Sequence, residues 1–343
     1  MYVVSRTPLR VSLFGGGTDY PSYFERKPGS VLGFAIDKYI YISLLELPVF
    51  SSYRFRASYS RIETVNAASE IQHPMIRALL EHYHINGPLD ISAQADLPAS
   101  SGLGSSSAFT VGMINALSAL TAAEKTKYEM AREAIYAEQT LLKENVGIQD
   151  QLHASFGGIN RFNFQGPDFS IEPIRISGRD LKLLTDWMIL IHTGITRRAT
   201  EVVTEQITKT KTGSLDSTLE AMGALVGEAQ KRLEGGCDEA DIRELAKLLD
   251  QSWQMKKGLS SSISGSAIDE LYSHCLNAGA LGGKLCGAGS GGFLLMIVPP
   301  EKRHTLFEAV GKNNCIDFRI DTAGSTVIHQ TLPHFSTKAS DSQ

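Results

Sequence analysis

The sequence predicts an α+β fold, in which strands and long helices both contribute to the core. Strand patterns occupy residues 2–14 and 30–45 near the start of the chain and residues 281–298 near its end. A long helical pattern covers residues 198–256 between them. A chain of 343 residues has room for one large domain or two medium ones.

The hydrophobic period divides the first half of the chain into elements. Residues 89–95 alternate apolar with polar side chains, which predicts a half-buried strand. Residues 106–121 are apolar on nearly every side, which is typical of a buried helix. The predicted elements in this half are strands at 2–14, 30–45 and 89–95 and helices at 74–83, 106–121 and 125–144.

Glycine pairs mark the start of the second half. A helix that reaches residue 156 ends at Gly157-Gly158, and strand and turn patterns follow over residues 159–173. We place the domain boundary in this segment, which predicts domains at 1–165 and 166–335 and a frayed polar tail at 336–343. The further predicted elements are a buried strand at 187–192, helical segments at 198–256 and 266–278, and strand, glycine turn and strand at 281–298.

Composition narrows the class of protein. A net charge of −4 argues against non-specific nucleic-acid binding, which needs a basic face. No apolar run approaches the ~20 residues of a membrane span, and the first residues lack the pattern of a signal peptide. The four cysteines form no CxxC pair, which favours reduced, packed thiols. These features predict a cytoplasmic protein that binds neither nucleic acid nor membrane.

The central glycine-rich stretch, residues 96–110, reads DLPASSGLGSSSAFT and precedes the predicted buried helix. Glycines let backbone N–H groups approach an anion, and a helix start adds free N–H groups and a positive dipole end. Strand, glycine turn and helix therefore form a candidate phosphate cradle, with serine hydroxyls available for hydrogen bonds or magnesium. The alternative is structural: Ser105 or Ser106 caps the helix and the glycines only make a tight turn.

Two other glycine-rich stretches flank the central one along the chain. Residues 284–298 read KLCGAGSGGFLLMIV, for which a plain hairpin turn is the alternative to a binding loop. Residues 12–24 read SLFGGGTDYPSYF, where Asp19 follows the glycines; its alternative is an aspartate that caps the turn.

The three stretches, in this order, resemble the motifs of the GHMP kinases, the superfamily of galactokinase, homoserine kinase, mevalonate kinase and phosphomevalonate kinase. TPLRVSLFGGGTDY resembles the substrate motif, LPASSGLGSSSA the ATP motif, and KLCGAGSGG the C-terminal glycine motif. The resemblance implies a kinase that uses ATP and Mg²⁺. It also implies two lobes, a mixed β/α N-terminal lobe and a ferredoxin-like C-terminal lobe, with the active site between them.

The resemblance assigns roles by position. Asp150 would face the reacting hydroxyl, Arg10 would be its catalytic partner, and Ser106 with Glu138 would hold magnesium. The implied ATP-binding residues are Pro98, Ser101, Gly102, Leu103, Gly104, Ser105, Ser106, Ser107, Gly287 and Gly289, with Gly291 in support. The implied substrate-binding residues are Asp19, Gly17, Thr18, Tyr20, Arg197 and Lys257. Without the family, Glu138 would be interpreted as a solvated helix residue and Asp150 as a cap.

The motifs around these residues indicate which molecule accepts the phosphoryl group from ATP. Gly16-Gly17 stand where galactokinases carry Glu-His, which argues against galactose. GGGTDY, ITR at 195–197 and SWQMKK at 252–257 resemble the kinases of D-glycero-D-manno-heptose 7-phosphate, which act on the anomeric hydroxyl. The basic residues of these motifs could clamp the sugar's phosphate or be solvated helix charges. The alternatives are a fucokinase-like kinase of a free sugar and a non-catalytic regulator of the same fold. The sequence is also compatible with a homodimer.

Overall fold

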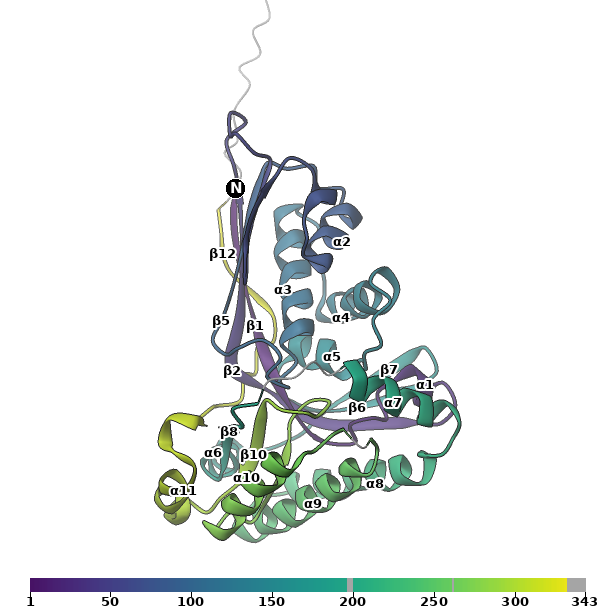
Figure 1. The fold of residues 1–343 in the computed structure, drawn as a ribbon, viewed down its shortest axis with the longest axis vertical. Helices are drawn as coiled ribbons and strands as arrows, with labels where there is room; N and C mark the ends of the chain where they lie inside the picture. Colours follow the sequence, from purple (N-terminus) through teal and green to yellow (C-terminus); the bar gives the residue numbers. More distant parts are fainter. Residues whose placement is uncertain (196–199, 261, 332–343) are drawn as a thin grey trace, which may run out of the picture.

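The computed structural model describes residues 1–195, 200–260 and 262–331 and contains two lobes, each built on its own sheet (Figure 1). The larger sheet has the strand order β12-β1-β2-β5-β3-β4, with β6 paired to β2 and β7 to β6. Its strands are β1 (Tyr2–Phe14), β2 (Gly29–Glu46), β3 (Phe55–Ser58), β4 (Ile62–Val65), β5 (Leu89–Ala95), β6 (Ile159–Gln165), β7 (Asp168–Pro173) and β12 (Thr326–Gln330).

The long antiparallel pair β1–β2 bends in its middle and changes neighbours there. The register shifts between Pro8 and Leu9, where proline supplies no N–H to the ladder. Before the bend, residues 29–34 of β2 pair with β6; after it, residues 40–46 pair with β5. The bend directs the end of β1, with Arg10 and the glycine turn that follows, toward the second lobe.

Helices cover one face of the larger sheet (Figure 1). The central one is α3 (Ser105–Leu120), which is buried on nearly every side as its composition predicts. Gly112 brings it close to β1: a Cβ there would lie 2.8 Å from the Thr7 hydroxyl. Beside it lie α2 (Pro74–His82), α4 (Lys127–Tyr136) and α5 (Gln149–Phe156).

The second lobe is built on an antiparallel sheet of order β11-β8-β10-β9. Its strands are β8 (Met188–His192), β9 (Gly282–Leu285), β10 (Phe293–Ile297) and β11 (Cys315–Ile316). Its helices include α6 (Gly178–Asp186), α8 (Asp216–Leu233), α9 (Glu239–Lys257), α10 (Ser266–Asn277) and α11 (Arg303–Val310). Trp253 of α9 is fully buried in a core formed by these helices and the sheet.

The chain passes between the two sheets more than once. Strands β7 and β12 both follow residue 165, yet both pair in the larger sheet. The division into domains at 1–165 and 166–335 stays a prediction, and the predicted frayed tail at 336–343 lies outside the described residues.

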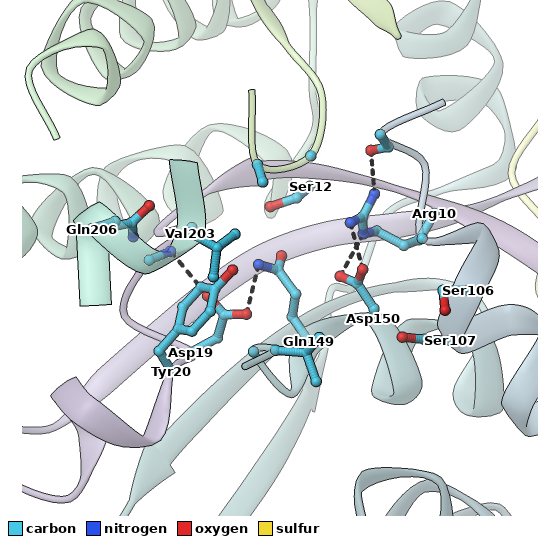
Figure 2. Close-up of a pocket in the computed structure, with 18 of the residues that line it drawn as sticks. Arg10, Ser12, Asp19, Tyr20, Ser106, Ser107, Gln149, Asp150, Val203 and Gln206 are labelled. Atoms are coloured by element: carbon cyan, nitrogen blue, oxygen red, sulfur yellow. Dashed lines mark hydrogen bonds and ion pairs between the residues drawn. The ribbon is translucent and has the colours of Figure 1, made fainter. Parts of the chain in front are cut away.

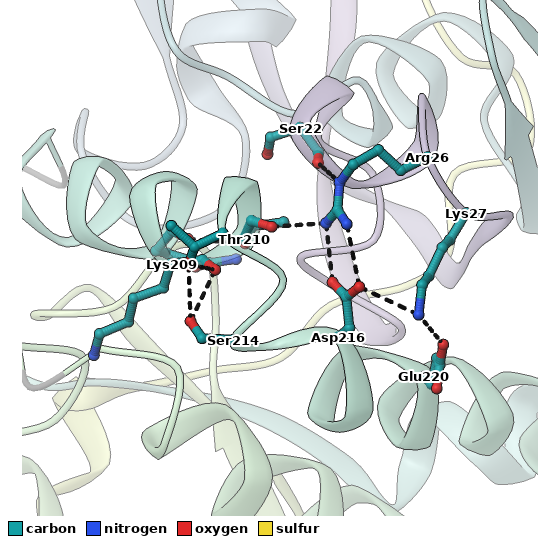
Figure 3. Close-up of polar contacts among 10 residues, drawn as sticks. Ser22, Arg26, Lys27, Lys209, Thr210, Ser214, Asp216 and Glu220 are labelled. Carbon is teal, nitrogen blue, oxygen red and sulfur yellow. Dashed lines mark hydrogen bonds and ion pairs between the residues drawn. The ribbon is translucent and has the colours of Figure 1, made fainter.

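A polar cluster joins α1 (Pro21–Phe24), just after the first glycine turn, to the second lobe (Figure 3). The Arg26 guanidinium donates to both carboxylate oxygens of Asp216, at 2.9 and 3.1 Å, and to the Thr210 carbonyl at 2.7 Å. Lys27 adds ion pairs to Asp216 and Glu220. These contacts hold the end of α7 (Thr200–Lys211) and the start of α8 against α1.

His153 of α5 gives the fold a predicted sensitivity to acid. Its ring is fully buried against Gly33 and packs edge-on to Phe162, and neither nitrogen has a hydrogen-bond partner among the described residues. Burial lowers its pKa from 6.5 to about 3. Between these values the unfolded chain binds one proton more than the native protein, so stability falls as pH falls, by up to about 1.4 kcal/mol per pH unit.

We therefore expect urea unfolding between pH 7 and 4 to show a steeper loss of stability in the wild type than in His153→Leu. Equal slopes in the two proteins would show that this histidine does not carry the acid sensitivity.

Candidate active site

A cavity of about 250 Å³ lies where three glycine-rich loops meet between the lobes. The loops are the turn after β1, the loop before α3 and the loop between β9 and β10. In the view of Figure 2, Asp150 lies between a group around Asp19 and Gln149 on one side and Ser106 with Ser107 on the other. The cavity therefore has two ends with a carboxylate between them.

Arg10 and Asp150 form the centre of the site. Arg10, on β1, is buried, and its Nε and Nη2 donate to the two carboxylate oxygens of Asp150 at 2.8 and 2.7 Å. Its Nη1 donates to the Gly102 carbonyl at 2.6 Å. Asp150, in the first turn of α5, keeps a quarter of its side chain exposed to the cavity. A bidentate fork of this kind fixes the direction of a carboxylate as well as its charge.

Asp19 lies at the end of the cavity away from Ser106 and Ser107 (Figure 2). Its Oδ1 accepts from the Gly17 N–H at 2.9 Å and its Oδ2 from the Gln149 amide at 2.8 Å. Burial raises the pKa of this carboxyl. Two buried acceptors beside it, Ser12 Oγ and Gln149 Oε1, have no partner among the described residues. Together they offer several hydrogen-bonding atoms to a ligand rich in hydroxyl groups.

The loop before α3 exposes a helix start. Gly104 occupies the N-cap position with φ 73°, and no side chain caps the helix. The alternative that Ser105 or Ser106 caps this helix is therefore wrong. Both serines line the cavity, and Ser106 is exposed there. The free N–H groups of the first turn can receive an anion.

The third glycine loop packs directly on this one. A Cβ at Gly102 would lie 2.6 Å from the Cys286 carbonyl oxygen, and a Cβ at Gly287 would lie 2.6 Å from the Gly102 Cα. Gly289 and Gly291 similarly pack against the backbone of Ile263 and Ile195. Residues 284–298 do form a hairpin, because β9 and β10 pair antiparallel. Its loop also packs on the central loop, and only glycine permits this approach.

Glu138 lies in a π-helical turn, η2 (Ala137–Leu141), and is fully buried at the cavity edge. Its Oε2 accepts from the Ser107 hydroxyl at 2.9 Å and the Gln151 amide at 2.6 Å, while Oε1 has no partner among the described residues. Burial raises its pKa to about 8. An orphaned buried carboxylate oxygen beside serine hydroxyls fits a Mg²⁺ ion, which commonly takes one carboxylate and completes its shell with phosphate oxygens.

The described residues contain no group of three or more His, Cys, Asp or Glu side chains that could hold a metal ion. No helix in the described part of the chain is long and apolar enough to cross a membrane.

Of the predicted substrate-binding residues, Gly17 and Tyr20 line the cavity and Thr18 does not. Its hydroxyl donates to the Gly15 and Ser30 carbonyls and holds the turn in shape. Lys257 also points elsewhere, with its Nζ 3.4 Å from Asp269. Arg197 lies outside the described residues.

Three of the predicted ATP-binding residues, Pro98, Ser101 and Leu103, belong to the central glycine-rich stretch but do not line this cavity. Ser101 is buried with its carbonyl against Gly292, and the Leu103 carbonyl accepts from the Arg10 N–H at 2.9 Å. Pro98 lines a neighbouring pocket of about 730 Å³, which shares Ser105 and Ser106 with the cavity. The walls of that pocket are largely apolar and aromatic and include Ile40, Tyr59, His73, Leu97, Phe109 and Leu142.

Sequence reasoning did not assign four residues that line the cavity: Ser12, Gln149, Gln206 and Lys284. Lys256, one of the basic residues of the SWQMKK motif that could clamp a phosphate, also lines it. Gln149 and Lys284 are neighbours of predicted residues in their motifs, and that adjacency is a usable signal. Lys256 and Lys257 are consecutive residues of α9, so their side chains point about 100° apart around the helix axis, and the Lys256 side chain is the one that faces the cavity. Gln206, on α7, faces Gly17 across the cavity and carries no local signal.

Two family models match the chain: the GHMP kinases N terminal domain over residues 68–158 and the GHMP kinases C terminal over residues 233–317. A curated Campylobacter jejuni protein named D-glycero-alpha-D-manno-heptose 7-phosphate kinase is 33% identical over 322 residues, or 90% of this chain and 93% of the relative.

Two solved structures share the fold. A crystal structure described as a putative sugar kinase from Campylobacter jejuni has a TM-score of 0.74 and 27% identity, covering 95% of this chain and 98% of that one. A D-glycero-D-manno-heptose 1-phosphate kinase from Bacteroides thetaiotaomicron has a TM-score of 0.77 and 22% identity, covering 96% and 100%.

Proposed function

This chain belongs to the GHMP kinase family and is an ATP-dependent sugar kinase, and from that premise we propose that its acceptor is D-glycero-D-manno-heptose 7-phosphate. We propose further that the γ-phosphoryl group goes to the anomeric hydroxyl, which gives the 1,7-bisphosphate. The name of the Campylobacter relative supports the acceptor. The observation that carries the mechanism is Asp150, held by Arg10 between the substrate end and the serine end of one cavity.

The nucleotide would lie across the serine end. The apolar and aromatic pocket beside Pro98 suits a flat base, and His73 stacked on Phe109 at a centroid distance of 4.9 Å forms part of its wall. The phosphates would then reach the uncapped start of α3, where Ser105 and Ser106 open into both spaces. The loop contact between Gly102 and Gly287 would keep this cradle in shape.

Ser106 and Glu138 would hold Mg²⁺, with Ser107 orienting the Glu138 carboxylate. When bound, the cation neutralises charge on the phosphate oxygens. The orphaned Glu138 Oε1 is the observation that supports this placement.

The acceptor would lie at the other end. Asp19, Gln149 and Ser12 would hold its hydroxyl groups, with Gly17 and Tyr20 in the wall. A kinase of this kind needs positioning and charge neutralisation more than covalent chemistry. Asp19 and Gln149 are buried and hydrogen-bonded to each other, which fixes these two anchors before the sugar arrives.

Asp150 would take the proton of the reacting hydroxyl. The acceptor oxygen forms a bond to the γ-phosphorus, the bond from that phosphorus to the bridging β–γ oxygen breaks, and ADP leaves. Arg10 keeps the Asp150 carboxylate aimed at the hydroxyl and, through Gly102, ties it to the phosphate loop.

The test is ADP release with Mg-ATP and a panel of acceptors: D-glycero-D-manno-heptose 7-phosphate, L-fucose, D-galactose, D-mannose, mevalonate and homoserine. We expect turnover confined to the heptose phosphate. Turnover on a free sugar such as fucose would overturn the proposed acceptor but keep the kinase mechanism. Silence across the panel, with ATP bound, would contradict both and favour a regulator.

A further inference from the structure

Two buried lysines in the wall of the cavity have no carboxylate partner. Lys256 of α9 and Lys284 of β9 are 9% and 2% exposed, and both line the cavity. The Lys256 Nζ donates to the Leu285 carbonyl at 3.0 Å and also to the Gly287 carbonyl. The Lys284 Nζ donates to the Leu13 carbonyl at 2.8 Å. Neither forms an ion pair with a residue that the structure describes.

Backbone carbonyls satisfy some hydrogen bonds of an ammonium group, but they do not neutralise its charge. Each ammonium has three N–H donors, so Lys284 keeps two beyond the Leu13 carbonyl and Lys256 keeps one. Burial lowers the pKa of Lys256 to about 7 and that of Lys284 to about 8. Two uncompensated buried cations in one wall are costly unless a ligand brings negative charge to them.

Their position favours the acceptor end of the cavity. Leu13, which accepts from Lys284, comes just before the glycine turn that leads to Asp19. Asp19 itself lines the same cavity as both lysines. The serines and Glu138, which mark the proposed nucleotide end, belong to elements of the first lobe. Lys256 reaches toward that end only through the Gly287 carbonyl, in the loop that packs on Gly102.

We propose that Lys256 and Lys284 form the subsite for the phosphate group that the sugar acceptor already carries. This assignment rests on the proposed function for the identity of the acceptor. It replaces Lys257 with Lys256 as the lysine of the SWQMKK segment that meets the ligand, and it adds a second lysine from the glycine motif. The subsite would select phosphorylated over free sugars, because a buried ammonium strongly prefers an anion to a hydroxyl group.

The test compares Lys256→Gln and Lys284→Gln with Lys247→Gln, an exposed lysine on the same helix as Lys256. Each cavity variant should raise the KM for heptose 7-phosphate about 10- to 100-fold, the span expected for a charged hydrogen bond. The KM for ATP, and kcat/KM for the same heptose without its phosphate, should stay within about twofold of the wild type. A matching rise in the KM for ATP would instead assign the lysines to the nucleotide's phosphates and overturn the proposal.

A binding measurement separates this proposal from the proposed function. With ADP present to occupy the nucleotide end, inorganic phosphate should raise the Tm of the wild type and of Lys247→Gln but not of the two cavity variants. If the wild type does not phosphorylate heptose 7-phosphate, the acceptor is wrong, while this shift still supports a phosphate subsite. No shift in the wild type would overturn the subsite itself.

A second pair of variants covers the case in which a glutamine variant does not fold. Lys256→Met and Lys284→Met keep a side chain of similar length that suits a buried position, and they should also lose the phosphate-induced rise in Tm in the presence of ADP. A rise of wild-type size in both methionine variants would contradict the proposal.

Discussion

Asp150→Asn should lower kcat by about 10²–10⁴-fold, the range typical of a positioned acid–base group, and leave the KM for ATP nearly unchanged. An asparagine keeps the shape of the side chain and one acceptor for Arg10, so the cavity should keep its form. What is lost is the carboxylate that we propose takes the proton of the acceptor hydroxyl. Steady-state kinetics with saturating acceptor measures kcat and the KM for ATP separately.

The matched control is Asp168→Asn, at a highly exposed position outside the cavity, which should turn over like the wild type. Near-normal turnover by Asp150→Asn would remove Asp150 from the proton transfer. The Arg10 fork would then be structural.

Arg10→Lys should lower kcat by about 10²–10³-fold, the cost typical of removing one preorganised donor from a reacting centre, and should raise the KM for ATP as well. One guanidinium holds both oxygens of Asp150 and the Gly102 carbonyl. A lysine is a point charge with no fork, so it cannot span the three acceptors. Because Gly102 belongs to the proposed phosphate loop, the lost contact should weaken nucleotide binding, an effect not expected for Asp150→Asn.

Arg56→Lys serves as the control, because Arg56 pairs with Asp90 at 2.9 Å outside the cavity. If Arg10→Lys lowers kcat but leaves the KM for ATP unchanged, the hydrogen bond from Arg10 to the Gly102 carbonyl does not contribute to nucleotide binding. Full activity in this variant would contradict the proposed role of the fork.

The central part of the site was predictable because its signals are local. A glycine stretch before an apolar helix requires special backbone conformation and a helix start within a few residues, and the structure has both at Gly104 and α3. The resemblance to the GHMP kinases predicted that Arg10, Asp150 and Glu138 belong to one site, and all three line the same cavity in the structure. The spacing of apolar residues alone was enough to predict the half-buried strand β5 and the buried helix α3.

What the sequence could not supply depends on contacts between distant segments. One miss did have local signals: turns at Gly213 and at Gly235-Gly236 divide the described part of the predicted helical region at 198–256 into α7, α8 and α9, and Asp238 caps α9. Whether Lys256 or Lys257 faces the cavity depends on how α9 packs on β9, which local sequence does not encode. Gln206 meets Gly17 only because Arg26 and Asp216 hold the end of α7 and the start of α8 against α1 (Figure 3).

The most direct measurement is the ³¹P NMR spectrum of the product formed from ATP and D-glycero-D-manno-heptose 7-phosphate. We predict a new phosphate resonance coupled to the anomeric proton, beside the retained 7-phosphate signal. A new phosphate coupled to a proton on another carbon would contradict the placement of the anomeric hydroxyl at Asp150, and ADP formation without any sugar bisphosphate would contradict the proposed reaction.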